Sequence, residues 1–355
     1  MKTEHILIIR FSAMGDIAMT VPVVEALAKQ YPHVRITVLS KPFAKVFFEE
    51  LAPNVGFMGA DVKGEYKGVK GLNALYRRLS AKHFTAIADL HNTLRSKYLR
   101  MRFNLNRNRV EHINKHKNGK RRLTSQHNKI LEQQPTSFEN YADVFSKLGY
   151  PIDPHFVSIF EGKTPDFSAL PNNMHEKLAG EKWIGIAPFA AHHGKIYPLE
   201  QMEEVIKQLS ERNDIRIFLF GGGKAEKVQL NEWAARYACC TNASSQLEGL
   251  YDELMLMSQL DVMLSMDSAN MHLASLTATP VVSIWGATHP FGGFMGWNQS
   301  EENAIQQDFD CRPCSIFGNK KCRRGDLACL SCITPEQIAE KVEKVIDTKS
   351  PIINP

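Results

Sequence analysis

The sequence has no uninterrupted apolar run of the roughly 20 residues that a membrane-spanning helix needs. Its first apolar run leads into a glycine-containing turn and not into a small-residue cleavage site, which argues against a secretory signal. That turn carries one glycine, Gly15, where the dinucleotide-binding fingerprint has three, which argues against a simple NAD enzyme. Short repeats and low-complexity segments are also lacking. These absences predict a cytoplasmic globular protein.

The length and composition indicate two ordinary domains. A chain of 355 residues is too long for one typical core and suits two domains of roughly 150 residues each. Its 43% hydrophobic and 23% charged residues are typical of globular proteins.

Charge is unevenly distributed. The net charge is +5, yet residues 95–129 alone contribute +11, with twelve Lys and Arg against the single acid Glu111, so the remainder carries about −6. Such a segment indicates an anionic partner, namely phosphates, nucleic acid or a membrane surface, or else a solvated loop. Aromatic residues for stacking on bases are sparse in it, only Tyr98 and Phe103, so we expect no nucleic-acid partner.

Apolar strand-like runs alternate with amphipathic helical stretches through both halves of the chain, which predicts α/β architecture with parallel sheets covered on both faces. The runs are residues 5–11, 35–40, 84–90, 183–189, 215–221, 261–265 and 280–286. The basic stretch 106–122 interrupts the pattern, and we expect it to end the first sheet in a loop. Four prolines fall between residues 149 and 182, where the periodicity lapses and the domain boundary belongs.

The sequence thus predicts two Rossmann-like, doubly wound parallel sheets. The expected domains are residues 1–165, residues 175–334, and a C-terminal helix and tail at 335–355 that packs back on the first domain. In open parallel sheets, ligands bind beyond the carboxyl ends of the strands, so we expect the site in a cleft between the two sheets.

The first strand end carries Gly15 and Asp16 at the start of a helix. The glycine allows close approach of a ligand, and the helix start favours an anion. Asp16 is interpreted either as a helix cap or as a general base at the mouth of the cleft.

Three strand ends in the second half carry groups suited to a diphosphate. Lys195 precedes a helix that starts near Leu199, and a triple-glycine turn is followed by Lys224 and Glu226. The third strand end has Asp267 and Ser268 at a helix start, with His272 one turn further on. Backbone N–H groups at such a start bind anions, although a helix cap with a partly buried histidine is the alternative.

The segments RFSAMGDIAMTVPVVEAL, DLHNTLRSKYL, APFAAHHGKIYP and MDSANMHLASLTATPVVSIWGATHP together resemble glycosyltransferase family 9, the ADP-heptose:lipopolysaccharide heptosyltransferases. The resemblance spans both halves in the right order. It implies a GT-B fold and an inverting, metal-independent transfer of heptose from ADP-heptose to an inner-core acceptor. It also implies a peripheral location at the inner face of the cytoplasmic membrane, with an anionic glycolipid as acceptor and no cofactor.

The resemblance also assigns roles. Asp16 matches the catalytic base, whereas Gly15, Arg10 and Arg95 would face the acceptor. The expected donor-binding residues are Lys195, Glu226, Asp267, Ser268, Ala269, Met271 and His272. Ala269 stands where the family usually has glycine, which leaves the donor sugar open: the alternatives are transfer of another sugar, or a nucleotide-sugar epimerase on the same fold.

Five of the seven cysteines cluster between Cys311 and Cys332, and they include two CxxC pairs that fourteen residues separate. This spacing is typical of a structural zinc site. In a reducing cytoplasm, packed free thiols are the alternative. Either role would be structural, since four thiolates leave no open metal position.

Overall fold

The computed structural model describes residues 4–348, so the expected tail at 349–355 lies outside the described residues. The chain forms two compact units. Unit 1 comprises Met1–Lys115 and Pro135–Ile159, and unit 2 comprises His116–Gln134 and Phe160–Pro355. Between residues 4 and 348, no helix is both long and apolar enough to cross a membrane.

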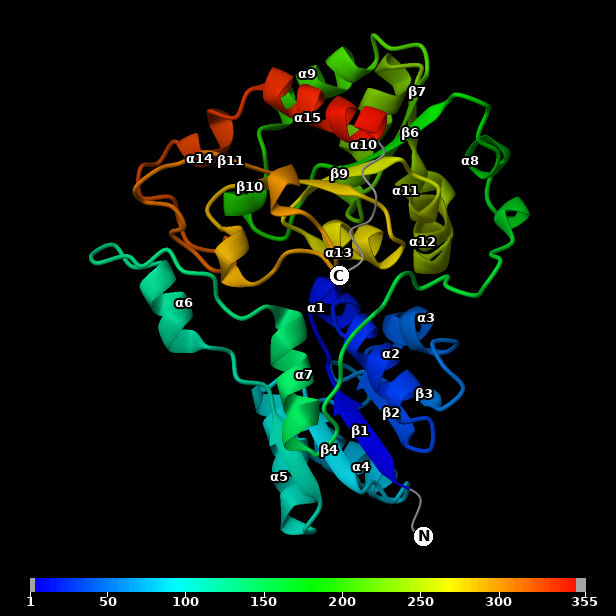
Figure 1. The fold of residues 1–355 in the computed structure, drawn as a ribbon, viewed down its shortest axis with the longest axis vertical. Coiled ribbons are helices and arrows are strands. Elements are labelled where there is room, and N and C mark those ends of the chain that lie inside the picture. The colour runs from blue at the N-terminus through cyan, green and yellow to red at the C-terminus, as the bar shows by residue number, and fades with distance from the viewer. Residues whose placement is uncertain (1–3, 349–355) are drawn as a thin grey trace. The chain divides into compact units, whose positions relative to one another are not determined.

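Unit 1 is built on a parallel sheet in the order β3-β2-β1-β4-β5 (Figure 1). The strands are β1 His5–Ile9, β2 Arg35–Ser40, β3 Val55–Gly59, β4 Ala86–Asp89 and β5 Arg109–His112. The helices are α1 Met14–Ala18, α2 Val21–Gln30, α3 Lys45–Phe48, α4 Gly68–Ser80, α5 Leu94–Leu105 and α7 Ser137–Lys147. All five residues of β1 are buried, because this central strand is covered on both faces.

Unit 2 is built on a second parallel sheet, in the order β11-β10-β9-β6-β7-β8. The strands are β6 Lys182–Ala187, β7 Ile215–Leu219, β8 Cys240–Asn242, β9 Val262–Met266, β10 Val281–Trp285 and β11 Ala304–Gln306. The helices are α6 Lys117–Leu123, α8 Asn172–His175, α9 Leu199–Leu209, α10 Lys224–Arg236, α11 Ala243–Gln246, α12 Leu250–Ser258, α13 Ala269–Leu276, α14 Ala328–Ser331 and α15 Pro335–Thr348.

Helix ends follow local chemistry. Helix α7 begins with a capping box, in which Glu139 N–H donates to Thr136 Oγ1 at 3.1 Å and Thr136 N–H donates to Glu139 Oε2 at 2.7 Å. Helix α2 carries Pro22 in its first turn, where the missing N–H costs no hydrogen bond.

The expectation of a loop over 106–122 is wrong. The chain forms β5, which pairs with β4, and then α6. Strand β5 lies at the sheet edge, where partial exposure removes the need for an apolar run. The segment 116–134, expected in the first domain, packs with unit 2.

The C-terminal helix was expected to pack on the first domain, but its described part belongs to unit 2. Ile338, Val342 and Ile346 of α15 are buried in the core of unit 2, which also contains Val205 and Leu209 of α9. Their spacing places them on one face of the helix, which covers this sheet.

Candidate active site

Asp16 lies in the first turn of α1, just beyond the end of β1. Its Oδ2 accepts a hydrogen bond from Ala13 N–H at 2.9 Å and forms an ion pair with Arg10 Nη2 at 2.7 Å. Asp16 is thus not the N-cap residue itself, which is Ala13, but its carboxylate binds the N–H of that residue from the third helical position. Its side chain nevertheless keeps 29% exposure, against 8% for Arg10. A held but accessible carboxylate is suited to accept a proton from a bound hydroxyl.

Arg10 is buried, and its guanidinium holds the Asp16 carboxylate in place. Its Nη1 donates to Leu90 O at 2.6 Å, and its guanidinium lies 5.8 Å from the centre of the Tyr141 ring. Burial disfavours the charge, but Tyr141 and the Asp16 carboxylate outweigh burial, so the pKa of Arg10 is raised. Of the other expected acceptor residues, Gly15 is buried within α1 and Arg95 is exposed at the start of α5.

His91 lies beside this group and had no role in the sequence-based prediction. Its Nε2 is 3.1 Å from Ser12 Oγ, and its Nδ1 is 3.2 Å from Thr93 Oγ1. Burial, together with the charge of Arg10, lowers the pKa of His91 to about 3, so the ring is neutral at physiological pH. The buried Asp89 holds this turn, because its Oδ1 accepts from His91 N–H at 3.0 Å. The strand-end position of the DLHNTLRS segment was the available signal.

Lys195, Asp267 and Thr288 converge in unit 2 from the ends of three adjacent strands. Lys195 Nζ is 2.8 Å from Asp267 Oδ2, and Thr288 Oγ1 donates to the same oxygen at 2.8 Å. Asp267 is almost fully buried, whereas Lys195 keeps 15% exposure. The carboxylate therefore orients the lysine, whose side chain stays partly exposed.

Glycines allow the segment carrying Lys195 to pack closely on its neighbours. Ala287 N–H donates to Gly194 O at 2.9 Å. A Cβ on Gly286 would lie 2.7 Å from the same oxygen, and one on Gly318 would lie 2.5 Å from Lys195 Cγ. Side chains at either position would disturb the contact, so these glycines set the location of the lysine.

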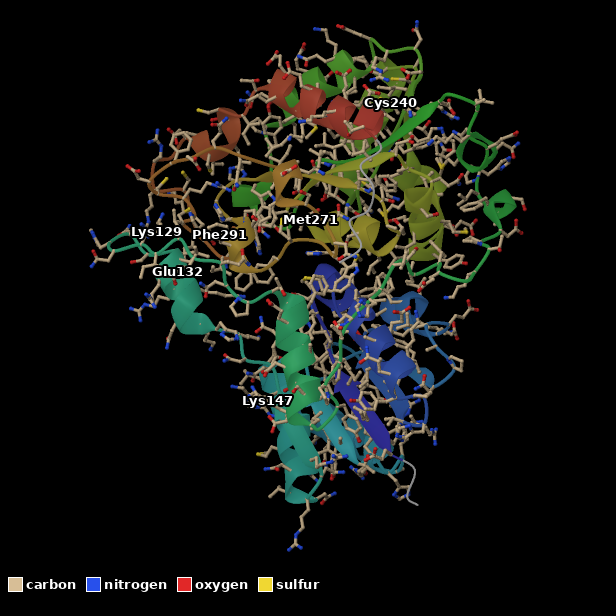
Figure 2. All side chains as sticks on the ribbon, viewed as in Figure 1. Lys129, Glu132, Lys147, Cys240, Met271 and Phe291 are labelled. Atoms are coloured by element: carbon tan, nitrogen blue, oxygen red, sulfur yellow. The ribbon has the colours of Figure 1, made fainter. Side chains whose placement is uncertain are left out.

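The start of α13 contributes backbone donors. Ser268 is the N-cap residue, but its side chain makes no capping bond; its Oγ lies 3.3 Å from Ser265 Oγ. Ala269 is the first helical residue, and Met271, labelled in Figure 2, and His272 are buried one turn on. The first-turn N–H groups, which the N-cap side chain leaves uncapped, are those that bind anions in proteins.

Glu226 folds back on the triple-glycine turn. Its Oε2 accepts from Gly222 N–H at 2.7 Å and from Gly223 N–H at 3.1 Å. The carboxylate of this expected donor-binding residue thus fixes the loop between β7 and α10.

One pocket in unit 2 is lined by four cysteines: Cys311, Cys314, Cys322 and Cys329. Arg312 also lines it, and the sequence did not identify this arginine. Arg312 is buried, and its Nε donates to Gly286 O at 2.7 Å. Burial lowers the pKa of Arg312 to about 10, so it stays cationic and ties this loop to the end of β10. All seven cysteines are free thiols.

Residues 311–332, which we call the cysteine loop, do not fit a zinc site. Within residues 4–348, no group of three or more His, Cys, Asp or Glu has the arrangement of a metal site.

Two parallel Rossmann-like sheets define the GT-B fold class, with Asp16 at the strand ends of one sheet and the Lys195–Asp267 ion pair at the strand ends of the other. The sequence model of glycosyltransferase family 9 (heptosyltransferase) matches residues 72–322, and the chain belongs to this family. Both the expected family and the expected fold class are confirmed.

Named relatives support this assignment. The chain is 22% identical to the lipopolysaccharide core heptosyltransferase OpsX of Haemophilus influenzae over 305 residues, 81% of this chain and 80% of OpsX. The E. coli ADP-heptose lps heptosyltransferase II structure matches with a TM-score of 0.68 at 20% identity, over 97% of this chain and 99% of the other. E. coli heptosyltransferase WaaC with ADP-2-deoxy-2-fluoro heptose matches with a TM-score of 0.66 at 17% identity, over 98% and 100%. These structures are similar to the chain in fold.

Proposed function

We propose that the protein is an inverting heptosyltransferase that moves heptose from ADP-heptose to a lipopolysaccharide inner-core acceptor. The observation that carries the proposal is the Lys195–Asp267–Thr288 group beside the start of α13, in a chain of family 9. An accessible ammonium group next to uncapped N–H groups suits a diphosphate. The relatives' names supply the sugar and the acceptor.

In the proposed reaction, Asp16 accepts the proton of the acceptor hydroxyl as its oxygen attacks the anomeric carbon. The bond between that carbon and the diphosphate oxygen breaks on the opposite face, and ADP leaves with the bonding electrons. Lys195 and the N–H groups of α13 stabilise the negative charge that develops on the diphosphate. Because protein groups supply this stabilisation, we propose that no divalent metal is needed. Arg10 keeps Asp16 in place throughout.

The Asp16→Asn variant tests the base. It keeps the size of the side chain and a capping oxygen, so the fold should persist. General-base catalysis contributes roughly 100- to 10,000-fold, and transfer should fall by that factor. ADP binding, measured by calorimetry, should change less than about twofold, because the diphosphate contacts lie in unit 2. Transfer at more than a few per cent of the wild-type rate would remove Asp16 as the base.

The donor is tested separately with a panel of nucleotide sugars. ADP-heptose should raise the melting temperature of the protein more than ADP-hexoses or UDP-sugars. Greater stabilisation by another sugar would support a different transferase of the family. Conversion of a nucleotide sugar without any acceptor would support an epimerase.

We also propose that the protein acts at the inner face of the cytoplasmic membrane, where a glycolipid acceptor would be anchored. Co-fractionation of the protein with inner membranes, and its release by salt, is the expected behaviour of a peripheral enzyme.

A further inference from the structure

The segment 116–134 is fastened to the cysteine loop within unit 2. Lys129 Nζ donates to Asp310 O at 2.7 Å and to Arg312 O at 2.8 Å. Gln134 N–H donates to Phe291 O at 2.9 Å. Figure 2 labels Lys129 on this segment and Phe291 in the turn that follows β10. Two stretches that are far apart in the sequence therefore form one structural element.

This element presents eight cations that the proposed reaction does not use. We call them the basic surface: Lys117, Lys120, Arg121, Arg122, Lys320, Lys321, Arg323 and Arg324. Seven of the eight are exposed and Lys120 is half-buried; all belong to α6 or to the cysteine loop. Arg324 forms an ion pair with Asp326 at 3.0 Å. With the Gln126 amide oriented to suit its neighbours, its oxygen accepts from Arg323, which links the two stretches again.

Large apolar side chains are exposed on the same element. Leu131 and Phe317 are 55% and 54% exposed. The Phe317 ring lies 5.8 Å from the Phe294 ring, and Lys120 Nζ lies 4.2 Å from the centre of that second ring. Phe317 thus lies within a chain of contacts that leads directly to a cation of α6.

We infer that the basic surface docks the protein on a bilayer that contains anionic phospholipids. The cations meet the headgroup phosphates, while Leu131 and Phe317 enter the boundary between headgroups and acyl chains. A soluble phosphate would leave these apolar side chains in water. Nucleic acid would be read by stacking aromatics, and a leucine is unsuited to that role. This inference builds on the proposed membrane location and names the surface that produces it.

Vesicle flotation tests the inference with full-length protein and two lipid compositions, phosphatidylcholine alone and phosphatidylcholine mixed with phosphatidylglycerol. We expect binding to the mixed vesicles only, and release at raised salt. Each basic residue near an anionic surface contributes a factor of about five, so Arg121→Gln with Arg122→Gln should weaken binding roughly 25-fold. Phe317→Ser should weaken it as well, at unchanged net charge.

A matched control removes two lysines from elsewhere in unit 2, Lys207→Gln on α9 and Lys344→Gln on α15. It has the same net charge as the double arginine variant and should bind mixed vesicles like the wild type. Equal loss in both double variants would overturn the inference, because net charge alone would then explain binding. Tight binding of a labelled single-stranded RNA without vesicle binding would overturn it too.

An assay of the transfer reaction tests the proposed function separately from membrane binding. With a detergent-free, water-soluble core oligosaccharide as acceptor, the Arg121→Gln/Arg122→Gln variant should retain wild-type activity. Absence of transfer by the wild type in this assay would count against the proposed function and leave the vesicle result standing.

Discussion

Gly318 packs against Lys195, and replacing this glycine tests the proposed anion site without removing a charged group. Its φ is +72°, a conformation that favours glycine, and a Cβ there would lie 2.5 Å from Lys195 Cγ and 3.2 Å from Cδ. Gly318→Ala therefore combines backbone strain with displacement of the lysine side chain.

The two effects have different sizes and readouts. A left-handed alanine costs about 1–2 kcal/mol, which lowers the free energy of unfolding. Moving the ammonium group away from Asp267 removes one charge-assisted contact to the diphosphate of the proposed donor. Such a contact is worth about 1.5–3 kcal/mol, so ADP affinity should fall roughly 10- to 150-fold.

Gly325→Ala is the matched control on the same loop. Its φ is +85°, and no atom lies within 4 Å of an added Cβ. It should lose the same stability in thermal unfolding while binding ADP like the wild type in calorimetry. Equal ADP affinity of the two variants would show that backbone strain is the whole effect and that Gly318 does not position Lys195.

Two further predictions concern pH. Burial raises the pKa of Glu253 to about 7, so the folded state holds a proton that the unfolded state releases near pH 4.5, and stability falls as pH rises through this window. The Glu253→Gln variant should lack this fall, and its free energy of unfolding above pH 7 should exceed that of the wild type by about 1–2 kcal/mol. Chemical denaturation at several pH values measures both. His91, with its pKa lowered to about 3, stays neutral in the fold, so stability falls as pH drops below about 6.5. The free energy of unfolding of the His91→Asn variant should depend less on pH between about 4 and 6, with a slope smaller by about 1.4 kcal/mol per pH unit. An unchanged slope would mean that His91 is protonated in the folded protein.

The central strands could be predicted from the sequence, but the edge strands could not. Strands β1, β2, β6 and β9 are buried on both faces and therefore have continuous apolar sequences. Strand β5 has the sequence RVEH, and β3 carries two glycines in five residues. An edge strand pairs with a single neighbour and is less buried than a central strand. Its pairing therefore depends on the rest of the sheet more than on its own composition.

The same distinction separates the predictable from the unpredictable part of the site. The topology of parallel sheets places polar residues after apolar runs at one edge, which is why Asp16, Lys195 and Asp267 could be proposed from the sequence. Their partners lie on other elements: the Arg10 guanidinium is also fixed by the carbonyl of Leu90, and Lys195 meets Asp267 across two strand ends. These contacts set charge and orientation, and no local pattern encodes them. A carboxylate within the proposed anion site would look unfavourable from the sequence alone. The structure gives it a different role, because the buried Asp267 carboxylate binds Lys195 and Thr288, while the lysine side chain stays partly exposed.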